Sequence, residues 1–284
     1  MAGAGKPVKH HIAILFHEAD RDRVHHYAVS ELAAMWRSDG HDVTYIFGVK
    51  KFIPADLILV HVDLSVVPPH YIRFARKYPI VLNDKPTDIR KSSFSRHLLA
   101  PGNSYAGPVI IKSDLNYAGL PEAVRRRRFP LPGWFGRLRH RGAFRSPADY
   151  QVLGSIREVP PHWFKRKDVI VQRFCPEFEE GLYHIRLYQF LGDRHTCTRL
   201  SSPEPIVNDG TSVRSVSIEV HPEIEKMRRE LGFDYGKFDY VIHDGQPLLL
   251  DINKTTGAVA KATPEIQAAR RHRAGGIYSY FQNR

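Results

Sequence analysis

The side chains best suited to metal chemistry lie in the segment 236–257. Asp251 and Asn253 are two residues apart, so in a β-strand both side chains point to the same face. A hairpin partner that contains Asp239 can bring a third oxygen ligand to that face. Proteins usually hold Mg²⁺ by one or two carboxylates together with substrate phosphates. We therefore expect these three residues to bind magnesium beside a nucleotide; the alternative is a surface hairpin with solvated acids.

A lysine with a possible phosphate role ends the apolar run 109–112. Lys112 is followed by a loop of small residues that reaches Gly119. A buried ammonium is costly without an anionic partner, and a loop with glycine lets backbone N–H groups approach phosphates. We expect Lys112 to contact phosphate; the alternative is an edge lysine that extends its charged end to water.

Two patterns of hydrophobic residues must position these side chains. In residues 11–82, β-branched runs alternate with amphipathic segments, which predicts a parallel sheet with helices. The strands expected there are 12–16, 43–47, 57–60 and 80–82, and the helices are 23–37 and 71–77. Beyond residue 84, strands joined by tight turns predict antiparallel sheet. The strands expected there are 109–112, 169–174, 183–191, 195–200, 238–243 and 248–252, with helices at 92–99 and 222–231.

Composition narrows the class of protein. The chain has 284 residues and a formal net charge of +12. Residues 121–145, named the basic segment below, hold eight arginines against one acid, Glu122, and so supply +7 of that charge. No apolar run approaches the roughly 18 residues that span a bilayer, and the run 12–16 is too short for a signal-peptide core. With only Cys175 and Cys197 there is no disulfide framework, and we expect a cytoplasmic protein.

The order of these features resembles the ATP-grasp superfamily, which includes glutathione synthetase and the ribosomal-protein glutamate ligases. The order is the Lys112 strand and its loop, the apolar run 169–177, His184 and Arg186, Arg199, and finally Asp239 with Asp251-x-Asn253. The resemblance covers roughly residues 85–257. It implies a small α/β pre-ATP-grasp domain at 1–84. An α+β ATP-grasp module with antiparallel sheets follows at 85–284, with a small lobe at about 100–172.

The resemblance also implies a role for individual residues. Lys112 contacts the α- and β-phosphates of ATP, and Lys91 is the earlier ATP-contacting lysine, with Lys85 as its rival. Arg186 and Arg199 face the γ-phosphate and the reaction intermediate. The hinge whose backbone reads the adenine edge is Gln172, Arg173, Phe174 and Cys175. The acid on the ribose is one of Glu177, Glu179 and Glu180. The magnesium ligands are Asp239, Asp251 and Asn253.

Three departures from the usual pattern of the superfamily are visible. His184 precedes Arg186 where an aspartate is common, Asp251 takes the place of a more usual glutamate, and the phosphate loop has Ala118-Gly119 instead of two glycines. The shorter Asp251 can still ligate a metal. The histidine affects the details of its strand, not the fold.

The function that this resemblance implies is an ADP-forming carboxylate–amine ligase that uses ATP and Mg²⁺. Its partners are then small-molecule or peptide carboxylate and amine substrates, with a homodimer left open; neither a membrane nor nucleic acid is an expected partner. One alternative is a small-molecule kinase of the same fold that acts on an anionic substrate. The other is a polyanion-binding protein with a degenerate nucleotide site.

Two further features could touch the acceptor substrate. His17-Glu18 and His61-Val62-Asp63 each follow a strand of the expected parallel sheet, and ligands of open α/β sheets bind beyond the carboxyl ends of the strands. We expect loop histidines with satisfied hydrogen bonds there, with substrate contact as the alternative. The basic segment follows the phosphate loop directly. We therefore expect its charge to act at the active site, with a solvated loop as the alternative.

Overall fold

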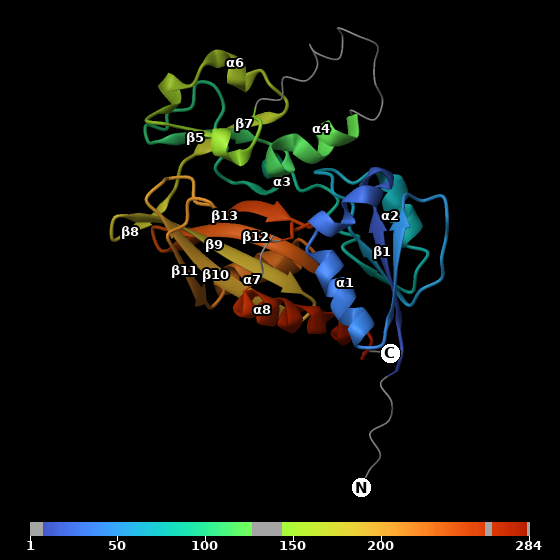
Figure 1. Cartoon of the computed structure of the whole chain (residues 1–284). Helices are drawn as coiled ribbons and strands as arrows, with labels where there is room; N and C mark the ends of the chain where they lie inside the picture. Colours follow the sequence, from blue (N-terminus) through green and yellow to red (C-terminus); the bar gives the residue numbers. More distant parts are fainter. Residues whose placement is uncertain (1–7, 127–143, 259–262, 283–284) are drawn as a thin grey trace.

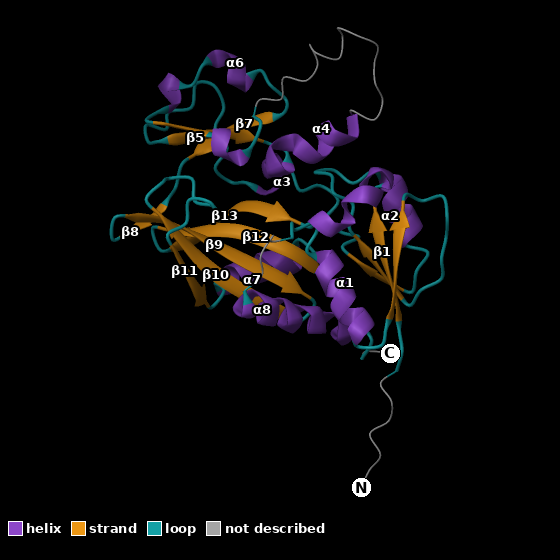
Figure 2. Ribbon diagram, viewed as in Figure 1, coloured by secondary structure: helices purple, strands orange, loops and turns teal. Residues whose placement is uncertain are grey.

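The structure, a computed structural model, describes residues 8–126, 144–258 and 263–282. These described residues form three sheets, one parallel and two antiparallel (Figure 2). The expected fold class, α/β followed by α+β with antiparallel sheets, is confirmed. Most of the basic segment, residues 127–143, lies outside the described residues.

The first sheet is parallel and four-stranded, with the order β2-β1-β3-β4. Its strands are β1 (His11–Phe16), β2 (Asp42–Phe47), β3 (Leu57–Val60) and β4 (Ile80–Leu82). β1 and β3 are almost fully buried, as expected for strands covered on both faces. The apolar runs of the sequence therefore predicted this sheet correctly.

The first helical segment is shorter than its sequence pattern predicts. A 3-10 helix, η1 (Glu18–His26), is followed by extended backbone at Tyr27, and α1 (Val29–Ser38) begins only after it. The predicted helix 23–37 is therefore wrong at its start. Tyr27 instead forms a β-bridge with Gly257. The second helix of this region, α2 (Pro69–Ala75), begins two residues early because Pro69 suits the first helical position.

Residues 91–173, called the small lobe below, contain the three-stranded antiparallel sheet β6-β5-β7, and the predicted lobe bounds of about 100–172 stay a prediction. Its elements are α3 (Lys91–Phe94), β5 (Val109–Ser113), η2 (Asn116–Gly119), α4 (Leu120–Arg126), η3 (Pro147–Asp149), β6 (Gln151–Leu153), η4 (Ile156–Glu158), α6 (Pro161–Phe164) and β7 (Val169–Arg173). The predicted helix 92–99 is wrong beyond Phe94. Leu98 bridges to Gln172, and the Leu99 N–H donates to the Val171 carbonyl, so sheet pairing replaces the helix.

The large sheet has the order β11-β10-β9-β12-β13, with β8 beside β9. Its strands are β8 (Glu177–Glu179), β9 (Leu182–Leu191), β10 (Arg194–Ser202), β11 (Arg214–Ile218), β12 (Tyr235–His243) and β13 (Gln246–Asn253). Helix α7 (Pro222–Glu230) packs through Ile224 into the apolar core of this sheet. The predicted hairpin is confirmed and is longer at both open ends.

The C-terminal helices join the large sheet to the parallel sheet (Figure 1). Ala274 at the end of α8 (Pro264–Ala274) and Ile277 in η5 (Gly275–Tyr280) share one apolar core with Trp36 of α1. The Trp36 indole N–H donates to the Ala274 carbonyl at 2.9 Å. The domain boundary near residue 84 stays a prediction. No described helix is both long and apolar enough to cross a membrane.

Candidate functional site

A cavity of about 360 Å³ is lined by residues of the small lobe and of the large sheet. Alternation along β12 and β13 directs Asp239, Asp251 and Asn253 to the cavity face. Asp239 lies opposite Asp251 in the strand register. A side chain at Gly236 would place its Cβ 2.4 Å from the Asn253 carbonyl oxygen, so glycine permits the close strand approach here. The structure therefore brings the three predicted metal ligands together.

Asp239 has one carboxylate oxygen with a hydrogen-bond partner and one without. Its Oδ2 accepts a hydrogen bond from Lys237 Nζ at 3.0 Å, while its buried Oδ1 has no partner among the described residues. Burial, aided by the charge of Asp251, raises the pKa of Asp239 although Lys237 opposes the shift. A cation bound to Oδ1 would give this oxygen a partner and would offset the cost of burying the negative charge of Asp239.

The other two candidate ligands already have partners. Asp251 Oδ1 lies 3.2 Å from Lys91 Nζ. Asn253 Oδ1 accepts a hydrogen bond from the Thr255 N–H at 2.7 Å, while the single proton of the Thr255 hydroxyl goes to Asp63 at 2.7 Å. No group of three His, Cys, Asp or Glu side chains in the described part of the chain could hold a metal without other ligands. Two carboxylates fit Mg²⁺ when phosphates complete the coordination, and Asn253 Oδ1 can join them because the Thr255 N–H uses only one of its two acceptor positions.

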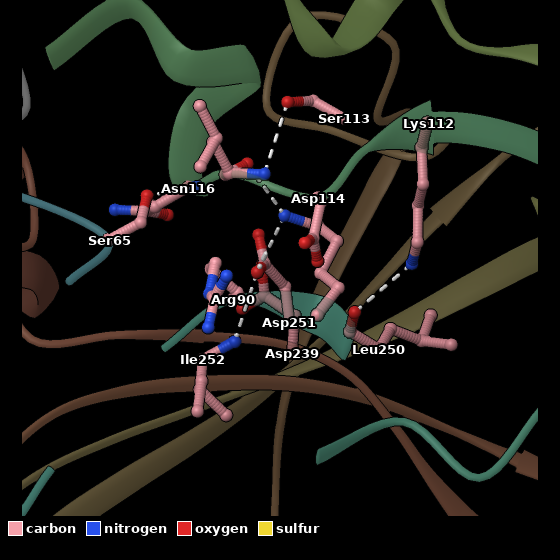
Figure 3. A network of polar contacts seen from close by, with 12 residues as sticks. Ser65, Arg90, Lys112, Ser113, Asp114, Asn116, Asp239, Leu250, Asp251 and Ile252 are labelled. Atoms are coloured by element: carbon pink, nitrogen blue, oxygen red, sulfur yellow. Dashed lines mark hydrogen bonds and ion pairs between the residues drawn. The ribbon is translucent and has the colours of Figure 1, made fainter. Parts of the chain in front are cut away.

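Lys112 projects from β5 toward the metal face (Figure 3). β12 and β13 have a bulge between Asp239 and Tyr240, and the carbonyl of Leu250, which this irregularity leaves outside the register, accepts from Lys112 Nζ at 3.2 Å. Burial and then the nearby charge of Lys91 lower the pKa of Lys112 from 10.5 to about 7. The lysine is therefore held where an added anion would restore its charge.

Lys91, and not its rival Lys85, lines the cavity. The Lys91 side chain is only 2% exposed and its ammonium donates to the Leu115 carbonyl at 3.0 Å. Lys85 is exposed. The position of Lys91 depends on Asp114, whose carboxylate accepts from the N–H and the hydroxyl of Ser92.

The predicted phosphate loop has an unusual backbone. Tyr117, Ala118 and Gly119 all have positive φ, at 45°, 57° and 78°. Two of them are not glycine, and such residues cost about 1–3 kcal/mol each when held in this region. The Tyr150 hydroxyl bonds the backbone of Ala118. Strained backbone beside a cavity is typical of a ligand-binding loop.

The predicted hinge lines the cavity through Gln172, Arg173, Phe174 and Cys175. Two of its backbone amides are engaged, because Arg173 N–H donates to the His97 carbonyl and Phe174 N–H to the Pro108 carbonyl. The buried Gln172 Oε1 has no partner among the described residues. The hinge thus offers polar groups to a ligand, but fewer free amides than expected. Cys175 and the buried Cys197 are free thiols.

Arg186 and Arg199 do not line the cavity, contrary to expectation. They face each other across β9 and β10, on the sheet face opposite to Ile185 and Leu187, and both ion-pair with Glu177. Because strand side chains alternate, the register that brings Leu187 to the cavity turns Arg186 away from it.

The predicted ribose acids are also turned away. The Glu177 carboxylate is only 8% exposed and accepts from Arg186 and from the Ile242 N–H. Glu179 is exposed and pairs with Arg199 at 3.2 Å. Glu180 lies in the β8–β9 turn with a φ of 53° and is absent from the described cavity lining. Glu177 instead links β8 to β9 through Arg186 and to β12 through the Ile242 N–H.

The cation that faces Asp239 and Asp251 is Lys237, a residue that the sequence pattern had not singled out. It lies on the cavity face of β12, two residues before Asp239. Burial opposes its charge, but Asp239 and Asp251 outweigh burial and raise the pKa of Lys237. The signal was available, because the alternation that pairs Asp251 with Asn253 also pairs Lys237 with Asp239.

The loop between β10 and β11 is a second part of the site that the sequence analysis missed. Residues 205–209 line the cavity. Asn208 shapes the loop by accepting from the N–H groups of Gly210 and Thr211. Asp209 is exposed at this wall, near enough to Lys237 to raise its pKa.

The two histidine segments have different outcomes. His17 Nδ1 accepts from the Ala19 N–H at 3.1 Å, so its hydrogen bonding is partly satisfied as expected. His61 is fully buried, and neither ring nitrogen has a partner among the described residues, so the expected satisfied loop histidine is wrong there. Burial lowers the pKa of His61 to about 4, which leaves the ring neutral.

An antiparallel small lobe over a large antiparallel sheet, preceded by a parallel sheet, is the arrangement of the ATP-grasp fold. No protein-family model and no curated protein matches the sequence. The chain is similar to D-alanine–D-alanine ligase from Bacillus anthracis complexed with ATP, at 10% identity over 96% of each chain and a TM-score of 0.51.

Two further solved structures agree on this fold. One is a RimK domain ATP-grasp protein from Sphaerobacter thermophilus, at 13% identity over 95% of this chain and 98% of that one, with a TM-score of 0.50. The other is the ATP-grasp ligase PsnB complexed with a minimal precursor, at 11% identity over 97% and 99% of the two chains, with a TM-score of 0.54. The chain has the ATP-grasp fold.

Proposed function

We propose that the protein is an ADP-forming ligase that uses Mg-ATP to activate a carboxylate as an acylphosphate for attack by an amine. The observation that carries this proposal is the unpartnered, buried Asp239 Oδ1, on one cavity face with Asp251 and beside the lysines Lys91 and Lys112. A carboxylate oxygen without a partner and a cluster of lysines in one cavity are complementary to a metal–phosphate ligand.

The similar structures support the choice of ligand. The Bacillus anthracis ligase is complexed with ATP, and PsnB has also been solved with Mg and ADP. In this chain Asp239 and Asp251 would hold magnesium, with Asn253 as a third ligand. The bound metal would offset the repulsion between a substrate carboxylate and the γ-phosphate.

The chain's own residues then bind and orient the reactants. Lys91 and Lys112 place ammonium groups on the phosphates, and the left-handed loop 117–119 presents backbone N–H groups. Lys237, held by Asp239, supplies the positive charge that we had expected from Arg186 and Arg199. The hinge Gln172–Cys175 lines the part of the cavity that would take the base.

The proposed reaction balances in two steps. A carboxylate oxygen of the substrate forms a bond to the γ-phosphorus while the bond from phosphorus to the ADP oxygen breaks. The amine nitrogen then forms a bond to the carbonyl carbon. The bond between that carbon and the phosphate oxygen breaks, inorganic phosphate leaves, and the amine proton passes to solvent. The substrates are carboxylates and amines, either small molecules or peptides; PsnB, complexed with a precursor, supports the peptide case.

Product analysis tests this proposal. Mixtures of candidate carboxylates with Mg-ATP and hydroxylamine should release ADP and form a hydroxamate, because hydroxylamine traps an acylphosphate. Lys112→Met should lose both products, while Lys85→Met, at an exposed lysine, serves as the matched control. A stable phosphorylated product without hydroxamate would mean a kinase, and the absence of any ADP would favour a polyanion-binding protein.

A further inference from the structure

A second cluster of buried polar side chains lies at the carboxyl ends of β1 and β3, the position called the crevice below. In the order β2-β1-β3-β4 the chain passes from β1 to one side and then returns to the other, so β1 and β3 flank the switch point of the sheet. Ligands of open α/β sheets bind in the crevice outside such a switch point. Asp20 follows β1 and Asp63 follows β3, and both are buried.

A guanidinium group of the chain itself fills this crevice. Arg125 of α4 reaches across from the small lobe and donates to both carboxylate oxygens of Asp20, at 2.8 and 2.6 Å. It also lies 3.6 Å from Asp63. The side chains of Arg125, Asp20 and Asp63 are only 8%, 2% and 10% exposed. A cation is thus held between two carboxylates away from solvent.

The crevice adjoins the proposed metal site. Asp63 accepts from the Tyr27 hydroxyl at 3.0 Å and from the Thr255 hydroxyl at 2.7 Å. The backbone N–H of Thr255 in turn donates to Asn253 Oδ1 at 2.7 Å. One residue therefore bridges the acid of the crevice to a candidate magnesium ligand, which puts the crevice beside the position of the phosphates.

Two groups in or beside the crevice are left without partners, which is unusual for a purely structural ion pair. Arg125 Nε and both ring nitrogens of His61 are buried and unbonded among the described residues. Buried polar groups without a partner cost about 1–3 kcal/mol each, so native proteins seldom keep them without a functional reason. Arg125 pairs with Asp20 and Asp63, but its own Nε and the ring nitrogens of His61 stay without partners among the described residues.

We propose that this crevice is the acceptor site of the ligase, and that it recognises a cationic group, ammonium or guanidinium, on the amine substrate. Arg125 occupies the position of that group and competes with it. The assignment of this site to the acceptor substrate rests on the proposed function, whereas the binding of a cation there does not. The two carboxylates favour a cation and disfavour an anionic acceptor. The acceptor then carries a positive charge besides the neutral amine that attacks.

Binding of methylguanidinium tests the cation site without any turnover. Arg125→Ala leaves the Asp20–Asp63 pair open, and millimolar methylguanidinium should raise the Tm of this variant along a saturable curve. The matched control is Arg76→Ala, which breaks an exposed ion pair with Asp84 and should show no saturable response. Adding Asp20→Asn to Arg125→Ala should remove the response. Equal responses of Arg125→Ala and Arg76→Ala would overturn the proposal.

A second test measures turnover, and its first part uses the wild-type protein and so needs no variant. With Mg-ATP and a carboxylate donor, ADP formation should be stimulated by 1,4-diaminobutane more than by butylamine, which differs from it by one amino group. Arg125→Ala should lower the KM for the diamine by about 10-fold, because the internal competitor is gone. Equal stimulation by both amines, or an unchanged KM for the diamine, would contradict the acceptor assignment.

The two tests separate the cation site from the ligase. If methylguanidinium binds to Arg125→Ala but no mixture yields ADP, the proposed function fails and the cation site stands. If ADP and hydroxamate form but methylguanidinium does not bind, the ligase stands and this inference fails.

Discussion

Replacing Lys112 with methionine should stabilise the nucleotide-free protein near neutral pH. Burial and the charge of Lys91 lower the pKa of Lys112 from 10.5 in the unfolded chain to about 7 in the folded one. At about 1.36 kcal/mol per unit, Lys112 then costs about 4 kcal/mol of stability at pH 7 and about 2 kcal/mol at pH 9. The sign follows because the unfolded chain binds the extra proton, so the cost falls as the pH rises toward 10.5.

Urea unfolding at pH 7, 8 and 9 measures this effect. The free energy of unfolding of Lys112→Met should exceed that of the wild type, and the excess should shrink with rising pH. Lys85→Met, which replaces an exposed lysine, should show no such trend. Because other titrating groups are common to both proteins, the difference isolates Lys112. An excess that is absent, or that grows with pH, would refute the reasoning.

Three other substitutions test neighbouring parts of the account. Lys237→Met should abolish ADP formation while Lys237→Arg retains part of it, as kcat would show; full activity of the methionine variant would remove Lys237 from the site. Arg186→Met leaves the buried carboxylate of Glu177 with the Ile242 N–H and a longer 3.8 Å contact to Arg199, and should cost about 1–3 kcal/mol in urea unfolding with the KM for ATP changed less than twofold. A large rise in that KM would instead return Arg186 to the nucleotide site. The side chain of Asn83, which follows β4 of the parallel sheet, makes three hydrogen bonds to residues 234 and 235 at the start of β12 and so joins the two sheets. Asn83→Ala removes these bonds at a position with φ of 59° and should cost about 2–3 kcal/mol; an unchanged unfolding midpoint would contradict this role.

The residues that could be predicted from the sequence are those fixed by local alternation. The spacing of Asp251 and Asn253 places both on one strand face whatever the sheet does, and the apolar strand before Lys112 leads into a buried site. The parallel sheet followed from its apolar runs in the same way. In these cases the alternation of side chains along a strand determines which face each residue occupies.

The predictions that differ from the structure concern residues whose conformation or orientation is set by tertiary contacts. Arg186 and Arg199 were assigned from a motif, but the register of β9 against β12 turns them toward Glu177. Tyr27 has helical neighbours in sequence, but its bridge to Gly257 makes it extended. The burial of Arg125 also depends on residues more than sixty positions away, so composition alone could show the basic segment but not its partner.

The central claim is that the cavity binds a magnesium nucleotide through the acids of β12 and β13. Isothermal titration of the wild-type protein with ADP, with and without Mg²⁺, and of Asp239→Asn in the same buffers, tests it most directly. We expect ADP to bind the wild type, to bind more tightly with Mg²⁺, and to lose the magnesium enhancement in Asp239→Asn. Failure of ADP to bind the wild type at millimolar concentration, or a magnesium enhancement that Asp239→Asn keeps, would contradict the account.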